Sequence, residues 1–191
     1  MKIYFIGGTG EFSSKIVEDL DTIYGHEVIG VGRTTGHAVP EENKKICKEA
    51  LDSDVIVLFT YASGSQLELV HDIFKTLKIN KWGGHFINIG STIVLHPKGT
   101  KDKTLDPWQV NIYRTKKKAI RDYGYEISRD FTKHDFKFTQ LHVGMLANKK
   151  MKQLDDYRNN CLQHNDISNM INWIACAPKN WNLHEIMIDG Y

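Results

Sequence analysis

Residues 2–13 read KIYFIGGTGEFS, an apolar run that leads directly into a turn with glycine at positions 7, 8 and 10. The next segment, residues 14–20, has the apolar spacing of an amphipathic helix. Such a strand–turn–helix is typical of a dinucleotide-binding unit, because a side chain in the turn would hold the backbone away from a pyrophosphate. The helix N-terminus then presents N–H groups and a positive dipole end to that phosphate. The third position of the Gly-x-x-Gly-x-x pattern, usually a glycine that allows close helix–strand packing, is Ser13.

The composition is that of an ordinary soluble globular chain. Its 191 residues are 41% hydrophobic and 25% charged, which fits a single domain spanning residues 1–191. A net charge of +2 gives no general reason to expect binding to nucleic acid or membrane. The longest strongly apolar run, residues 55–59, is too short to cross a bilayer, and no signal peptide precedes the first strand.

The cysteines and histidines suggest neither disulfides nor a metal site. Cys47, Cys161 and Cys176 are odd in number, widely spaced and in no C-x-x-C pair, which indicates reduced thiols in a cytoplasmic protein. The nine histidines are scattered and form no metal-ligand pattern. We therefore expect a cytoplasmic protein without a bound metal.

Strand and helix patterns alternate along nearly the whole chain. After the first strand we expect strands at 26–31, 54–59, 84–89, 136–143 and 185–189, and helices at 44–51, 67–77, 110–131 and 167–177. This order predicts an α/β fold with a doubly wound, mainly parallel sheet in three α/β/α layers. Between residues 32 and 44 only Ala38-Val39 before Pro40 suggests a strand, so this part of the sheet is expected to be shortened. A polar loop at 95–107 follows a strand at the carboxyl edge, where such sheets bind ligands.

The end of the second strand indicates which nicotinamide cofactor is bound. In dinucleotide folds an acidic residue there binds the 2′-hydroxyl of NAD, whereas an arginine accommodates the 2′-phosphate of NADP. Here the strand ends in Val31-Gly32-Arg33-Thr34-Thr35, without a carboxylate. A guanidinium can hold a phosphate through two hydrogen bonds, and the threonine hydroxyls can add donors. The sequence therefore favours NADP(H), the alternative being a solvated surface arginine.

Two residues of the predicted long helix carry proton chemistry. Tyr113 and Lys117 are four residues apart and so project from one helix face. A tyrosine pKa near ~10 makes a poor acid–base catalyst at neutral pH, but a nearby ammonium favours the phenolate. Upstream, Ser91 closes a buried strand, where its hydroxyl can hydrogen-bond a substrate carbonyl oxygen. The alternative is a Tyr–Lys pair on a solvated helix face.

Taken in order, these motifs resemble the short-chain dehydrogenase/reductase family over nearly the whole chain. The resemblance rests on the glycine turn, Arg33, Asn88-x-x-Ser91, Tyr113-x-x-x-Lys117 and the segment from His142 to Leu146. It implies a Rossmann fold in which Ser91 polarises a carbonyl, Tyr113 exchanges a proton, and Lys117 holds the ribose and lowers the tyrosine pKa. The cofactor-binding residues expected on this basis are Gly7, Thr9, Gly10, Glu11, Phe12, Arg33, Thr34, Thr60, Tyr61, Lys117 and, through its backbone, Leu146.

Several positions depart from the family pattern. Leu58-Phe59-Thr60-Tyr61 replaces the Asn-Asn-Ala-Gly motif, Val143-Gly144 replaces Pro-Gly, and the asparagine expected on the fourth helix has no counterpart. The leading hypothesis is an NADP(H)-dependent oxidoreductase. The alternatives are a nucleotide-sugar reductase or epimerase, and a non-catalytic NADP(H)-binding sensor or scaffold.

Expectations about partners are less specific. The basic segment from Lys98 to Arg121 suits a phosphate-bearing or acidic small-molecule substrate better than nucleic acid, because no base-stacking aromatic pattern accompanies it. The resemblance also implies a homodimer or homotetramer built from the long helix that contains Tyr113.

Overall fold

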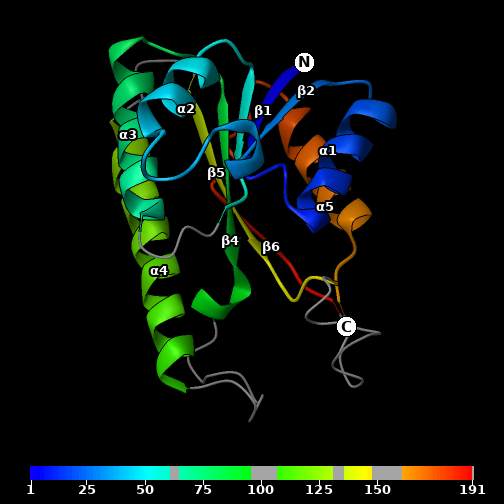
Figure 1. Cartoon of the computed structure of the whole chain (residues 1–191), viewed down its shortest axis with the longest axis vertical. Helices are drawn as coiled ribbons and strands as arrows, with labels where there is room; N and C mark the ends of the chain where they lie inside the picture. The colour runs from blue at the N-terminus through cyan, green and yellow to red at the C-terminus, as the bar shows by residue number, and fades with distance from the viewer. Residues whose placement is uncertain (61–64, 96–106, 131–135, 148–160, 191) are drawn as a thin grey trace.

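A computed structural model describes residues 1–60, 65–95, 107–130, 136–147 and 161–190. Its centre is a six-stranded sheet in the order β2-β1-β3-β4-β5-β6, and every neighbouring pair is parallel (Figure 1). The strands are β1 Lys2–Ile6, β2 Glu27–Val31, β3 Val55–Leu58, β4 His85–Ser91, β5 Lys137–Val143 and β6 Glu185–Ile188. The predicted parallel, doubly wound fold is confirmed.

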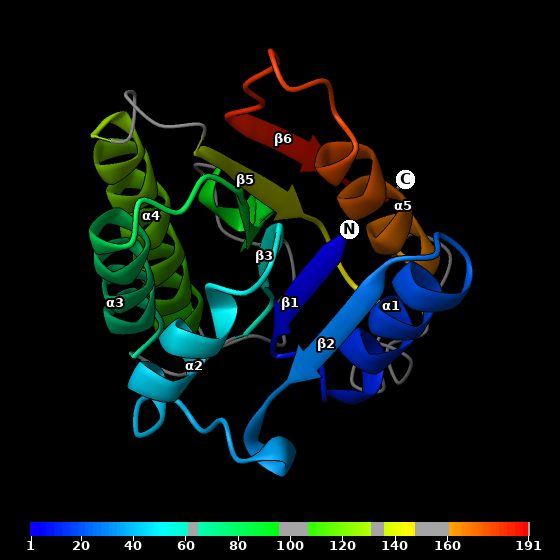
Figure 2. The same cartoon turned by 90° about the horizontal axis from the view of Figure 1, so that it is seen from above.

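Helices cover both faces of the sheet, as Figure 2 shows. One face carries α1 Glu11–Thr22 and α5 His164–Ala175, and the other carries α2 Asn43–Ala50, α3 Gln66–Ile79 and α4 Pro107–Arg129. Two short 3₁₀ helices, η1 Arg33–Thr35 and η2 Thr92–Val94, follow β2 and β4. The three predicted layers are therefore present. In the parts of the chain that the structure describes, no helix is long and apolar enough to cross a membrane.

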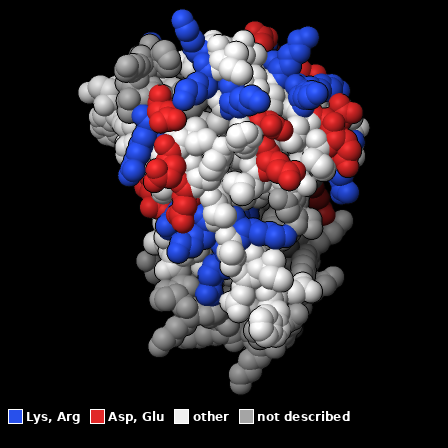
Figure 3. All heavy atoms as spheres, turned by 90° about the vertical axis from the view of Figure 1, so that its left-hand side faces the viewer, with Lys and Arg blue, Asp and Glu red and all other residues white. Residues whose placement is uncertain are grey.

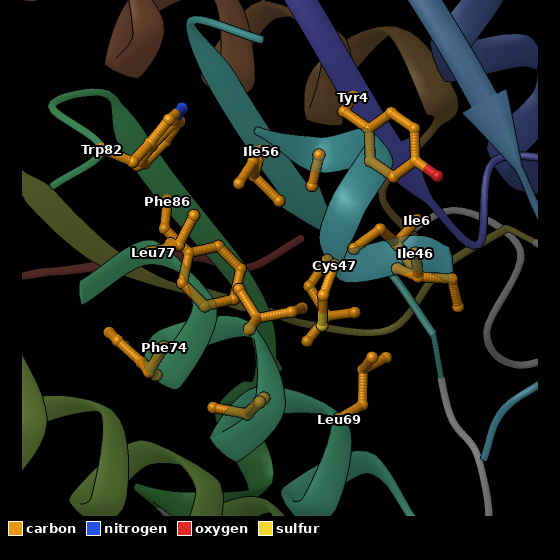
Figure 4. Close-up of a cluster of buried hydrophobic side chains, with 14 of the residues drawn as sticks. Tyr4, Ile6, Ile46, Cys47, Ile56, Leu69, Phe74, Leu77, Trp82 and Phe86 are labelled. Atoms are coloured by element: carbon orange, nitrogen blue, oxygen red, sulfur yellow. The ribbon is translucent and has the colours of Figure 1, made fainter. Parts of the chain in front are cut away.

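The inner strands β1, β3, β4 and β5 are buried on both faces, so they contribute to two separate cores. In β1, Tyr4 and Ile6 point toward α2 and α3, whereas Ile3 and Phe5 point toward α1 and α5, as strand periodicity requires. Figure 4 shows the first core, in which side chains of α2 and α3 meet those of the sheet. Phe74 packs edge-on against Phe86 there, with ring centroids 5.4 Å apart.

The sheet is shortened next to β2, as predicted. Residues 36–42 form turns without a strand, so β2 is the edge of the sheet. His37 anchors this segment: its Nε2 lies 2.8 Å from Oε2 of Glu49, which also accepts a hydrogen bond from the Tyr4 hydroxyl at 2.9 Å. A partly buried side-chain network thus holds this segment where a strand is missing. Residues 96–106, most of the predicted polar loop, lie outside the described residues.

Candidate active site

The glycine turn joins β1 to α1 and is fixed by contacts with two neighbouring strands. Gly7 has a φ of +90°, and a Cβ there would lie 2.2 Å from the carbonyl oxygen of Phe59. Its N–H donates to the carbonyl of Val31 at 2.8 Å. A Cβ on Gly8 would lie 2.9 Å from the Cα of Gly30. These two glycines are therefore required by packing inside the protein.

Gly10 differs from the other two because it is exposed. A Cβ added there would have one close neighbour, the Ser13 hydroxyl oxygen at 3.0 Å. The first bond inside α1 runs from the N–H of Ser14 to the carbonyl of Gly10, so the N–H groups of residues 11–13 precede the intrahelical ladder. An open glycine and a helix N-terminus together fit a pyrophosphate, although Glu11 adds an exposed carboxylate beside them.

Ser13 supports the turn from inside the protein. Its buried hydroxyl donates to the carbonyl of Gly7 at 2.6 Å and lies 3.2 Å from that of Gly10. The close helix–strand approach expected from a third glycine occurs instead at Gly8 and Gly30, against the side chain of Val17. Ser13 is therefore compatible with a compact turn.

The turn after β2 lies against the glycine turn and presents positive charge. A Cβ on Gly32 would lie 2.1 Å from the hydroxyl oxygen of Thr9, so the two turns touch. Arg33 and Thr34 are exposed, but the Thr35 hydroxyl is used within the turn, where it accepts from the N–H of Gly32 at 2.9 Å. The ammonium of Lys45 donates to the Gly36 carbonyl at 3.2 Å, which adds a second cation that our sequence reasoning missed.

The remaining predicted cofactor residues lie in α1 and in the segments that follow β3 and β5. Thr60 follows β3 beside Gly7, and Phe12 stacks on Phe59 with ring centroids 6.3 Å apart. Tyr61 lies outside the described residues. Leu146 forms a parallel bridge with Leu162 that uses the carbonyl of residue 145 and the N–H of residue 147. The N–H and carbonyl of Leu146 itself therefore point away from that bridge.

Tyr113 and Lys117 lie on one face of α4, as predicted. The Nζ of Lys117 is 5.8 Å from the centre of the Tyr113 ring. Lys117 is only 7% exposed, and its ammonium donates to Oε1 of Gln66 at 3.1 Å. Burial lowers the pKa of Lys117 to about 8. Lys117 is therefore a buried lysine beside a tyrosine ring. The alternative interpretation, a Tyr–Lys pair on a solvated helix face, does not describe this lysine.

Ser91 is the last residue of β4 and begins the short helix η2, against which α4 packs. Its hydroxyl oxygen lies 3.4 Å from the N–H of Ile93, so it caps η2. Its carbonyl oxygen is 3.2 Å from Nδ1 of His142, a fully buried residue whose Nε2 lies 2.6 Å from Glu185. The strand end that carries Ser91 is thus held from the β5 and β6 side, and the helix η2 that follows it packs against α4.

A further cation, Arg114, follows Tyr113 in the sequence. The residue is half-buried, and its Nε and Nη2 are shielded from solvent and have no hydrogen-bond partner among the residues that the structure describes. Shielded N–H donors without an acceptor are unfavourable, so these two groups would gain from a polar or anionic acceptor. By contrast, the depression of about 460 Å³ lined by Asn43, Leu67, Glu68, His71, Asp72 and Tyr123 is formed by α2, α3 and the middle of α4, away from Ser91.

Comparisons with known proteins identify the fold. No protein-family model matches the sequence, and curated protein sequences give no match either. Among solved structures, 3-alpha-hydroxysteroid dehydrogenase from Pseudomonas sp. B-0831 superposes with a TM-score of 0.71 and 13% identity over 100% of this chain and 96% of that one. Serine dehydrogenase from Escherichia coli gives 0.65 and 14%, over 99% and 97%.

A UDP-N-acetylglucosamine 4-epimerase from Bacillus cereus is also similar, with a TM-score of 0.71 and 18% identity over 99% of this chain and 78% of that one. Another similar structure is described as a short-chain dehydrogenase/reductase family protein, with a TM-score of 0.70 and 10% identity. The chain has the short-chain dehydrogenase/reductase fold. The Rossmann architecture expected from the resemblance is thereby confirmed.

Proposed function

We propose that this protein is an NADP(H)-dependent oxidoreductase that transfers hydride between the nicotinamide and a carbonyl or alcohol carbon. The observation that carries the proposal is the buried ammonium of Lys117 beside the ring of Tyr113, on a helix that packs against η2 after Ser91. Burial removes the charged amine from water, which is unfavourable. A Tyr–Lys pair on the surface of a helix would avoid this cost.

Each of the three residues has a defined part in this proposal. The bound cofactor supplies or accepts the hydride. The Tyr113 hydroxyl donates a proton to the substrate oxygen in the reducing direction and takes it back in the oxidising direction. The Lys117 ammonium favours the phenolate form of Tyr113 by charge attraction. The Ser91 hydroxyl donates a hydrogen bond to the same substrate oxygen and so stabilises the charge that develops there.

The preference for NADP(H) rests on the turn after β2. Exposed Arg33 and Thr34, together with the ammonium of Lys45, supply charge and donors for a 2′-phosphate. Similar structures are described with cofactors of both kinds, NADP⁺ on a serine dehydrogenase and NADH on the hydroxysteroid dehydrogenase. Nicotinamide binding is thus supported by the comparisons, whereas the turn after β2 is what favours NADP(H).

We propose a small acidic or phosphate-bearing substrate. The shielded Nε and Nη2 of Arg114, the residue that follows Tyr113 in the sequence, favour an anion. Nucleic acid is a weaker candidate, because Lys/Arg and Asp/Glu are interspersed over the face of the molecule in Figure 3. A homo-oligomer built through α4 also remains a proposal, supported by the exposed apolar side chains of Trp108 and Ile112. Light scattering of the purified protein measures that oligomeric state directly.

One alternative also has support. The similarity to a UDP-N-acetylglucosamine 4-epimerase keeps a nucleotide-sugar reductase or epimerase in consideration. Epimerisation leaves no net change in nicotinamide absorbance, whereas reduction of a carbonyl consumes NADPH stoichiometrically, so one assay separates the two.

The proposal is tested by fluorescence titration with NADPH and NADH, followed by turnover assays on paired acidic and neutral carbonyl compounds. We expect tighter binding of NADPH and faster turnover of the acidic member of each pair. Preferential binding of NADH would contradict the cofactor assignment. NADPH binding without turnover on any substrate would favour the non-catalytic sensor.

A further inference from the structure

The amine of Lys117 requires a hydrogen-bond acceptor, because an ammonium removed from water without partners is strongly disfavoured. The side chain reaches from α4 to the start of α3, where Oε1 of Gln66 accepts at 3.1 Å. Gln66 is 3% exposed, so this contact is shielded from solvent on both sides. The acceptor comes from a residue 51 positions earlier in the chain.

A glutamine at this position is unfavourable for simple packing. Gln66 begins the buried face of α3, which continues with Leu69, Val70, Ile73, Phe74 and Leu77. An apolar side chain there would extend the core. The Nε2 of Gln66 is also buried and has no hydrogen-bond partner within the described part of the chain, which costs of the order of 1–3 kcal/mol. The amide is therefore costly in this core position, and the acceptor that its Oε1 supplies to Lys117 is a contact that an apolar side chain could not make.

We propose that Gln66 is a positioning residue that holds the Nζ of Lys117 at Tyr113 through its Oε1. This inference rests on the proposed function and deepens it, since it names a residue that sets the position of Lys117. Gln66 acts through the lysine and touches no reacting atom. A neutral acceptor keeps the ammonium in place without the full charge attraction that a carboxylate would add.

Charged residues of α4 and of the elements beside it are not among the causes that shift the pKa of Lys117. On α4 its neighbours in sequence are basic: Arg114, Lys116, Lys118 and Arg121. On α3, Glu68 and Asp72 line the depression near Tyr123. On the sheet, Asn88 and Gln140 bond to each other and are neutral. Burial is the cause that lowers the pKa of Lys117. A carboxylate introduced at position 66 should therefore raise that pKa by charge attraction.

Two substitutions of opposite effect test the proposal. Gln66→Glu places a carboxylate against the ammonium, and Gln66→Met preserves the approximate volume but removes the acceptor. Glu68→Gln, at an exposed position two residues further along α3, is the matched control for changing one charge on this helix. The side-chain amines are titrated by NMR on the full chain, with the Lys117 signal assigned by its absence in Lys117→Met.

We expect a midpoint near 8 for Lys117 in the parent. The midpoint should move upward by about 1 to 3 pH units in Gln66→Glu and downward in Gln66→Met. Glu68→Gln should leave it in place. A midpoint that stays the same in both variants at position 66, or moves in one direction in both, overturns the proposal and leaves Gln66 as a packing residue. A thermal scan of each variant confirms that the folded state is being titrated.

The same variants separate this proposal from the proposed function. With a substrate in hand, the alkaline limb of the pH profile of kcat/KM should move in the same directions, and kcat should fall more than KM rises in Gln66→Met. If the NMR midpoints move as expected but the parent turns over no substrate, the oxidoreductase fails while the Gln66–Lys117 contact stands. If turnover is present and the midpoints do not move, Gln66 loses its role.

Discussion

The glycine turn between β1 and α1 and the Tyr113–Lys117 pair on α4 reach their geometry by different routes. The turn is built from backbone contacts: N–H groups of Gly7 and Gly8 meet the Val31 carbonyl, and Ser13 bonds back to Gly7. Lys117 depends instead on a side chain from another helix, the amide of Gln66. Changes in the turn are therefore expected to alter stability and cofactor binding, whereas changes around α4 alter chemistry and proton affinity.

The largest expected effect lies on α4. Tyr113→Phe removes the proton that the proposed mechanism transfers, so kcat should fall by roughly 10²- to 10⁴-fold while NADPH binding is retained. Steady-state kinetics and fluorescence titration measure the two quantities. The control is Tyr123→Phe, which removes another tyrosine hydroxyl of α4, one that bonds to His71 on α3. This variant should keep its activity. Full activity of Tyr113→Phe would remove the tyrosine from the mechanism.

Lys117→Met should separate stability from activity. Lys117 titrates near 10.5 when unfolded and at about 8 when folded, so the unfolded chain binds this proton more tightly. The lysine therefore lowers stability below pH 8 by roughly 3 kcal/mol, and this penalty disappears as the pH rises from 8 to 10.5. Lys117→Met should accordingly be more stable than the parent at pH 7 but inactive.

Urea unfolding at several pH values checks this expectation. The stability difference between Lys117→Met and the parent should shrink across the range from pH 8 to 10.5. The control is Lys118→Met, an exposed lysine on the same helix. A Lys117→Met variant whose stability relative to the parent does not change with pH would contradict the burial of the ammonium.

A smaller effect is expected at the cofactor end. Arg33→Ser removes a charged donor from the proposed 2′-phosphate site, so the preference for NADPH over NADH should drop by roughly 10- to 100-fold. Binding of NADH should be unchanged. Arg129→Ser, which removes an exposed arginine paired with Glu126 at the far end of α4, serves as the control. Equal losses for both cofactors would place Arg33 outside the 2′-phosphate site.

The smallest effect concerns the turn itself. Ser13→Ala deprives the Gly7 carbonyl of its hydroxyl donor and should lower the free energy of unfolding by about 1–2 kcal/mol. Chemical denaturation measures the loss. Ser14→Ala, which removes an exposed hydroxyl that bonds within the same helix turn, should cost less. Equal losses of unfolding free energy in the two variants would show that the buried hydrogen bond of Ser13 stabilises the protein no more than the exposed one of Ser14.

The contrast between the two regions also explains which features could be predicted. The strands, the helices, the shortened edge and the Tyr113–Lys117 face follow from local periodicity and turn chemistry, and the structure has them. Gln66 gave a weak signal, a polar residue at the head of an apolar helix stripe, but nothing in the sequence says what lies opposite it. Lys45 and the hydroxyl of Ser13 were missed for the same reason, since their partners are backbone carbonyls of a folded turn.

By itself, the stretch KIYFIGGTGEFS determined a strand, a turn that requires glycine and a helix, because backbone sterics and apolar spacing act over a few residues. It likewise placed Tyr113 and Lys117 on one helix face, since their spacing matches the helical repeat. Only the tertiary structure decided that this face is buried, that Gln66 receives the lysine, and that Ser13 supports the turn from within. Burial and long-range hydrogen bonds arise when distant segments pack together, and no local pattern encodes them.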